Sequence, residues 1–162
     1  MADDLTALHA IHSREDVCRW LYWGPRTREQ VREVLDGLID RPAAAGPWFA
    51  VEQLDTPGLI GSVSLQLGEH RQGELGFIFH PDHQGRGYAT EAARAVLRVA
   101  FEDHELHRVY GRLEPRNVGS GRVLEKLGMR REALLLENEW VKGEWQSEAI
   151  YALLAREWGA LR

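Results

Sequence analysis

The sequence predicts an α+β fold in which helices flank one mixed β-sheet, and three features of its patterning carry that prediction. Apolar residues recur at a helical period through the first 41 residues. Short β-type runs follow, separated by turns that contain proline and glycine. A strand, a helix and a second strand then succeed one another, which is the order of a parallel crossover.

The N-terminal segment is predicted to form helices and to end at Pro42. Proline stops a helix because it has no backbone N–H group to donate. The apolar positions that set the helical period are Leu5, Leu8, Ile11, Val17, Trp20, Leu21, Val31, Val34, Leu35, Leu38 and Ile39.

Three β-type runs come next. "WFAVEQL" from Trp48 and "LIGSVSLQL" from Leu59 flank the turn sequence "DTPG", and this arrangement predicts an antiparallel hairpin. The run "ELGFIF" from Glu74 continues the meander.

An amphipathic helix of about four turns is predicted after the third run, because an apolar stripe lies opposite charged residues. The stripe comprises Ala89, Ala92, Ala93, Val96, Leu97 and Ala100. The segment "HRVYGRLE" from His107 then returns to a strand, so residues 74–79 and 109–113 are expected to run parallel with a right-handed connection.

The C-terminal part is predicted to hold one short helix and two strands. The helix covers residues 118–127 and closes on Gly128, since glycine suits a left-handed C-terminal cap. The β-type runs cover residues 131–136 and "SEAIYALLAREW" from Ser147, with Trp158 at the end of the last strand.

Composition and charge limit the class of protein. With 162 residues, 44% of them hydrophobic, the chain is expected to form a single domain over residues 1–162. The net charge is -5 and the two signs are interspersed, so we expect no nucleic-acid partner. No apolar run reaches the roughly 20 residues of a membrane span and no signal peptide is visible, so we expect a cytoplasmic protein with no membrane partner.

The stretch "HPDHQGRGYATEAA" from His80 predicts an anion-binding turn before a helix. Backbone N–H groups at a helix start have no internal partners, and glycines at Gly85 and Gly87 let a diphosphate approach them closely. A plain tight turn is the alternative. The P-loop pattern is absent, and the dinucleotide fingerprint has Thr90 at its third glycine, although Glu114 stands where its ribose-binding acid would be.

The residues "QGRGYA" from Gln84 match the Q/R-x-x-G-x-G/A signature, and on them the chain resembles the GNAT superfamily of acyl-coenzyme A-dependent N-acetyltransferases. The blocks "HPDHQGRGYATEAARAVL", "LHRVYGRLEPRNVGSGRVLEKLGM" and "KGEWQSEAIYALLAREW" are similar to the ribosomal-protein N-terminal acetyltransferase (RimJ/RimL-like) branch. The resemblance covers residues 46–158 most clearly. It implies a GNAT-type fold, in which two central parallel strands splay apart.

The resemblance also implies a binding site for acetyl-coenzyme A (acetyl-CoA) and no metal. The backbone N–H groups of the loop would face the diphosphate, and the splayed strand would contact the pantetheine arm. Asn117 would hydrogen-bond that arm, cap the following helix, or do both. The implied coenzyme-binding residues are Phe77, Ile78, Phe79, Gln84, Gly85, Arg86, Gly87, Tyr88, Ala89, Thr90 and Asn117.

The implied reaction is direct attack of a primary amine on the thioester in a ternary complex. Glu74 is the candidate general base, directly or through water, and a solvated strand-end carboxylate is the alternative reading of this residue. Ser120 is the candidate hydrogen-bond partner of the departing sulfur, or else only a first-turn helix residue. Cys18 lies in an apolar pattern with no adjacent base, so we expect a buried side chain and not a nucleophile.

The acceptor is left open between a small-molecule amine and a protein N-terminus, and a non-catalytic acyl-CoA-binding protein is the alternative function. Five tryptophans are candidates to line the acceptor pocket: Trp20, Trp23, Trp48, Trp140 and Trp145. The edge strand with which the branch usually begins is not found in this sequence, so we expect either a sheet one strand short or a true start that lies upstream. We expect a dimer contact or an N-terminal helix to cover the exposed edge, and homodimers are common in this branch.

Overall fold

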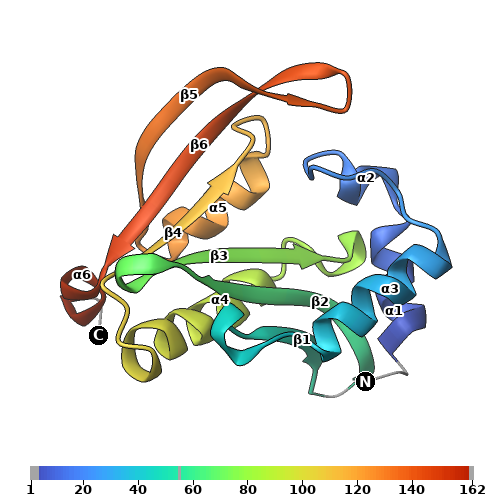
Figure 1. Ribbon diagram of the computed structural model, residues 1–162, viewed down its shortest axis with the longest axis horizontal. Coiled ribbons are helices and arrows are strands. Elements are labelled where there is room, and N and C mark those ends of the chain that lie inside the picture. The colour runs from blue at the N-terminus through green and yellow to red at the C-terminus, as the bar shows by residue number, and fades with distance from the viewer. Residues whose placement is uncertain (1–3, 55, 161–162) are drawn as a thin grey trace.

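The computed structural model describes residues 4–54 and 56–160, and their strands form one mixed sheet (Figure 1). Six described strands lie in the order β1-β2-β3-β4-β6-β5. They are β1 (Trp48–Gln53), β2 (Thr56–Leu67), β3 (Gln72–Phe79), β4 (Arg108–Leu113), β5 (Arg130–Val141) and β6 (Glu144–Leu154). Only β3 and β4 pair in parallel, so the predicted mixed α+β sheet is confirmed.

The helices lie before, between and after the strands. They are α1 (Leu5–His12), α2 (Glu15–Cys18), α3 (Arg28–Ile39), α4 (Tyr88–Arg98), α5 (Val118–Lys126) and α6 (Ala155–Ala160). Short 3-10 turns occupy Ala43–Ala45, Glu69–Arg71 and Pro81–His83, and a π-turn at Val99–Asp103 extends α4. No helix in the described part of the chain is long and apolar enough to cross a membrane.

The N-terminal helices form where the sequence predicts them. Thr27 and Gln30 form a capping box that starts α3, because each side chain accepts a hydrogen bond from the backbone N–H of the other. α1 contacts both α3 and β2. A small hydrophobic core results, built from Leu5, Leu8, Ile11, Val17, Val31, Leu35 and Leu59.

The main core lies under α4 and α5. Its helical members include Ala93, Val96 and Leu97, which belong to the apolar stripe predicted for α4. After α5, Gly128 adopts φ 83° and donates its N–H to Glu125 O, so the predicted left-handed helix end is confirmed.

The parallel pair β3 and β4 separates after a short contact. Pairing joins Gln72, Gly73 and Glu74 to residues 108–110, but β3 continues to Phe79 without a partner on that side. The two strands therefore diverge toward their carboxyl ends, and the backbone of β3 beyond Glu74 is left accessible on the β4 side. This is the splay that the resemblance implies.

The predicted last strand is wrong at its end. β6 stops at Leu154, and residues 155–160 form α6, where Trp158 is buried and stacks on Phe101. The Glu157 carboxylate accepts the N–H of Leu154 and so supports the start of this helix. The predicted strand over residues 131–136 is correct but too short, since β5 runs over Arg130–Val141.

Candidate active site

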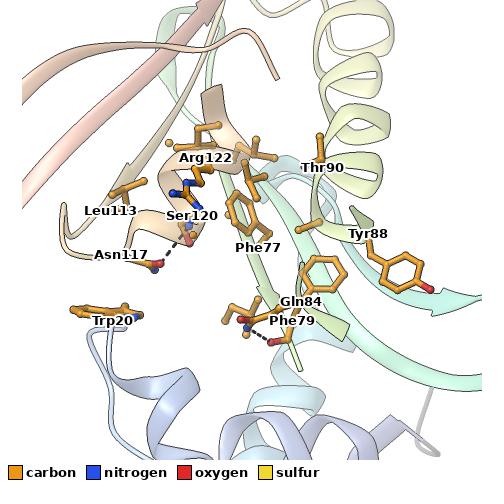
Figure 2. Close-up of a pocket in the computed structure, with 18 of the residues that line it drawn as sticks. Trp20, Phe77, Phe79, Gln84, Tyr88, Thr90, Leu113, Asn117, Ser120 and Arg122 are labelled. Carbon is orange, nitrogen blue, oxygen red and sulfur yellow. Dashed lines mark hydrogen bonds between the residues drawn. The ribbon is translucent and has the colours of Figure 1, made fainter. Parts of the chain in front are cut away.

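A cavity of about 680 Å³ crosses the sheet where β3 and β4 diverge. Figure 2 shows side chains from the N-terminal segment, β3, α4 and α5 around the same space. The expected residues that line it are Phe77, Ile78, Phe79, Gln84, Gly85, Gly87, Tyr88, Ala89, Thr90, Asn117 and Ser120. Of the residues expected at the site, Arg86 and Glu74 are outside this lining set.

The loop before α4 presents backbone donors to the cavity. Gly85 and Gly87 have φ values of 73° and 91°, which other L-residues rarely adopt, so glycine is required here for backbone conformation. The N–H groups of residues 85–90 have no acceptor within the described chain. The positive end of the α4 dipole lies at the same place, and together these features suit a diphosphate.

Gln84 holds this loop onto the sheet. Its Nε2 donates to the backbone oxygen of Phe79 at 3.1 Å (Figure 2). The imidazole Nδ1 of His80 accepts the N–H of Asp82 at 3.3 Å, which shapes the turn between them. The end of β3 and the start of α4 are therefore fixed relative to each other.

The start of α5 forms another wall of the cavity. The Asn117 Oδ1 accepts the N–H of Ser120 at 3.2 Å, so the capping role expected for Asn117 is present (Figure 2). Farther along the helix, Arg122 and Lys126 line the cavity one turn apart. Our sequence analysis missed these two cations, although basic residues at i and i+4 after the asparagine were the available signal.

Glu74 is held by an arginine. Arg112 donates Nε and Nη2 to the two carboxylate oxygens of Glu74 at 3.1 and 3.0 Å, and its Nη1 lies 3.5 Å from Glu148 Oε2. The hydrogen bonds that Arg112 donates to Glu74 raise the pKa of Arg112 above its ordinary value, so the guanidinium stays charged. Glu74 is thus a paired carboxylate beside the splay.

Glu148 is a second carboxylate at this place, and it is buried. The Tyr22 hydroxyl donates to its Oε2 at 3.5 Å. Burial raises the pKa of Glu148, and the neighbouring charges of Glu139 and Glu74 add to the effect against the opposing influence of Arg112. Burial, a hydrogen bond to Glu139 and the charges of Glu139 and Glu148 raise the pKa of Tyr22 to about 12. The ionised form of Glu148 is therefore a stronger base than that of an exposed glutamate.

The part of the cavity on the other side of the splay is what we call the acceptor chamber. The strand register places Ser62 opposite Ile78 and Ser64 opposite Gly76, so these four residues share one face of the sheet. Leu75, Phe77 and Phe79 alternate to the opposite face, under α4 and α5. The acceptor chamber is lined by Val17, Leu21, Trp48, Ser62, Ser64 and Ile78.

Of the five tryptophans predicted to line an acceptor pocket, Trp20 and Trp48 line the cavity. Trp23 packs instead against His12 and lies under the Arg26 guanidinium. Trp140 and Trp145 are exposed and pack edge to face against each other. The tryptophan side chain is the same at all these positions, so the sequence alone could not show which of them line the cavity.

Cys18 is buried, as expected. Its Sγ lies 3.3 Å from the backbone oxygen of His12, and burial raises the pKa of the thiol. A buried thiol with a raised pKa is a poor nucleophile. No group of three His, Cys, Asp or Glu side chains in residues 4–54 and 56–160 is placed to hold a metal ion.

Comparison with known proteins identifies the family. Residues 1–130 match the model described as "Acetyltransferase (GNAT) domain". The Bacillus subtilis (strain 168) protein named "Uncharacterized N-acetyltransferase YnaD" is 34% identical over 157 residues, 96% of this chain and 90% of the relative.

Two solved structures share the fold over nearly the whole chain. A GNAT-family acetyltransferase from Bacillus anthracis has a TM-score of 0.87 at 32% identity, covering 97% of this chain and 92% of its own. Spermidine N-acetyltransferase from Vibrio cholerae, solved with CoA and spermine, has a TM-score of 0.82 at 25% identity, covering 96% and 92%.

The chain therefore belongs to the GNAT family of acetyltransferases, and it is an acetyl-CoA-dependent N-acetyltransferase. Enzymes of this family use acetyl-CoA. The site fits that coenzyme, because unpartnered backbone N–H groups lie at the loop before α4 and the cations Arg122 and Lys126 face the same cavity.

Proposed function

We propose that the enzyme transfers the acetyl group of acetyl-CoA to a primary amine by direct attack in a ternary complex. The observation that carries the proposal is the continuity of the cavity, which joins the anion-binding loop to the acceptor chamber through the splay. Coenzyme and amine can therefore enter from opposite faces of the sheet and meet between β3 and β4.

Different residues bind the coenzyme, orient its pantetheine arm and polarise the thioester carbonyl. The N–H groups of residues 85–90, with Arg122 and Lys126, hold the anionic part of the coenzyme. The backbone of residues 77–79 orients the pantetheine arm, and an N–H group there polarises the thioester carbonyl. Asn117 supports that arm while it caps α5.

The transfer requires one bond to form and one to break. The ammonium first gives one proton to a carboxylate. The neutral nitrogen then bonds to the acetyl carbon and gives up its second proton to solvent as the carbon–sulfur bond breaks. The sulfur leaves as a thiolate that takes up a proton from solvent, and Ser120 stabilises it by a hydrogen bond. No covalent enzyme intermediate is needed.

We propose Glu74 as the proton acceptor. Its carboxylate lies at the point of divergence and is oriented by Arg112. Because Glu74 does not line the cavity, the proton reaches it through water. A substrate α-amine, with an ordinary pKa of about 7.7 to 8.0, needs less help than a lysine at about 10.4.

The RimJ/RimL-like branch is our proposed placement within the family, supported by the three sequence blocks around the loop, α5 and β6. Membership in this branch would make a protein N-terminus one possible acceptor. The similarity to spermidine N-acetyltransferase supports a small-molecule amine instead.

The experiment is thiol release from acetyl-CoA, with and without a panel of amines, alongside acetyl-CoA binding by calorimetry. Stimulated release together with mass-spectrometric detection of the acetylated amine is the expected result. Coenzyme binding without stimulation by any amine would favour the alternative, a non-catalytic acyl-CoA-binding protein. Absence of binding would contradict the assignment of the loop.

A further inference from the structure

Resting on the proposed acetyl transfer, we propose that the preferred acceptor is a primary amine carried on an uncharged, apolar body, such as an alkyl or aryl group. The selecting element is the acceptor chamber. The proposal concerns the body behind the reacting nitrogen, and it distinguishes such amines from polyamines and aminoglycosides, whose bodies carry further positive charges.

The walls of the acceptor chamber are apolar. Val17 belongs to the small hydrophobic core of the N-terminal helices, and Leu21, Trp48 and Ile78 pack against that core. These three are only half buried and line the cavity, so they keep apolar surface available to a ligand. An alkyl or aryl group placed there leaves water for a hydrocarbon surface, which is favourable.

The floor of the acceptor chamber is polar but uncharged. It carries the hydroxyl side chains of Ser62 and Ser64 on β2. Gly76 lies directly opposite Ser64, and a Cβ at that position would come 2.9 Å from Ser64 Oγ. Glycine therefore keeps the passage open between the serine floor and the splay.

The charged side chains that line this end of the cavity already have partners. The Asp16 carboxylate accepts hydrogen bonds from Arg14 at 2.9 and 2.8 Å. The Arg112 guanidinium is held by Glu74 through two hydrogen bonds and lies 3.5 Å from Glu148.

A second ammonium group in the acceptor would have to share the Asp16 carboxylate with Arg14, break one of these ion pairs or stay unpaired. Each choice costs free energy, because a charge moved from water into a partly enclosed site needs a partner. An uncharged body has no such cost. The chamber thus distinguishes amines by the charge of the body and not by the reacting nitrogen.

The test is a ranking of acceptors by kcat/KM at one pH and ionic strength. The acceptors with uncharged bodies are phenethylamine, isoamylamine and short peptides that begin with Met or Phe. The acceptors with charged bodies are spermidine and kanamycin. The uncharged bodies should exceed the charged ones by about tenfold or more, as expected for a pocket contact that distinguishes substrates. Comparing the peptides with the small free amines shows whether the preferred apolar acceptor is a protein N-terminus or a small molecule.

The outcomes separate the inference from the proposed function. Spermidine or kanamycin as the best substrate would overturn the inference and leave acetyl transfer established. Thiol release that no amine stimulates would count against the proposed function itself.

A charge introduced into the chamber provides a second test. Ser64→Asp places an unpaired carboxylate on the floor, so it should raise the spermidine to phenethylamine ratio of kcat/KM by about tenfold. Gln72→Glu is the matched control: it adds the same charge on the same face but at the paired end of β3, outside the cavity lining. The control should leave the ratio unchanged.

Acetyl-CoA affinity and melting temperature are measured for both variants to establish that each is folded. A folded Ser64→Asp variant with an unchanged ratio would overturn the role of the chamber. If the variant does not fold, the acceptor ranking of the unmodified enzyme still decides the proposal.

Discussion

At the residue scale, the ion pair between Glu74 and Arg112 changes how the candidate base is understood. A strand-end glutamate would be free and solvated, but this carboxylate is held by two hydrogen bonds from one guanidinium. Arg112 also approaches the buried Glu148, so one arginine organises carboxylates from β3 and β6. Arg112 therefore determines where both carboxylates lie.

Replacing Glu74 by glutamine tests its role as base. Glu74→Gln keeps the side chain's size but removes its basicity, so kcat should fall by about 100-fold or more, as for loss of a general base. Acetyl-CoA affinity, measured by calorimetry, should be unchanged. Glu132→Gln is the control, because Glu132 also pairs with an arginine, Arg108, but away from the splay. A Glu74→Gln variant with the kcat of the unmodified enzyme would show that Glu74 is not the general base.

The buried side chain of His12 should make the folded protein less stable in mild acid. Burial, with a smaller contribution from the Arg26 charge, lowers the pKa of His12 to about 4. The unfolded chain binds a proton near pH 6.5, so it binds more protons than the folded chain between these values, and stability falls as pH decreases through that window.

The expected loss between pH 7 and pH 5 is on the order of 1–2 kcal/mol. Urea unfolding at the two pH values measures it, and the His12→Gln variant should show a smaller difference. An equal pH dependence in both proteins would exclude His12 as the cause.

At the element scale, α5 contributes both a cap and two cations to the cavity. Asn117 fixes the first turn, and Gly119 and Ser120 lie against the cavity. Gly121 is buried, and a Cβ there would lie 3.5 Å from the Tyr151 hydroxyl. The two glycines therefore have different surroundings: one borders the cavity and the other packs against β6.

Removing a cation from α5 should weaken coenzyme binding. Arg122→Ala is expected to raise the Kd of acetyl-CoA about tenfold, the effect of one lost charge-assisted hydrogen bond. The loss should shrink as salt concentration rises, because screening weakens the wild-type interaction too. The control Arg156→Ala removes an exposed arginine from α6 instead. An unaltered Kd for Arg122→Ala would place the coenzyme phosphates elsewhere.

At the scale of the whole molecule, the turn of the β5–β6 hairpin extends toward the N-terminal segment around α2 (Figure 1). The Lys142 ammonium donates to the backbone oxygens of Cys18 and Arg19 at 2.6 and 3.1 Å. Arg116 lies over the Trp20 ring and pairs with Glu144. Distant segments of the chain thus meet at the edge of the cavity.

We expect a homodimer in solution. β5 ends the strand order, and its residues Leu134, Leu135 and Leu136 are 44%, 41% and 75% exposed. An apolar, unpaired strand edge favours association with a second chain. Light scattering should give twice the monomer mass. Leu136→Glu should give a monomer with an unchanged far-UV spectrum. A monomeric unmodified protein at micromolar concentration would contradict this expectation.

Local sequence determined the succession of elements, the glycine turn before α4 and the end of α5. Hydrophobic periodicity and glycine depend on short-range sterics and burial, which are visible in a few neighbouring residues. The same local reasoning failed at residues 155–160, where Ala155 and Trp158 stand three residues apart, a spacing that suits one face of a short helix.

Only the tertiary structure decided which residues meet at the site. Arg112 and Glu148 come from β4 and β6 and meet through strand register, and Ser62, Ser64 and Gly76 share a face for the same reason. Which of the tryptophans line the cavity was likewise decided by packing. Contacts between residues far apart in the chain depend on pairing and packing across the whole sheet, and no local pattern records them.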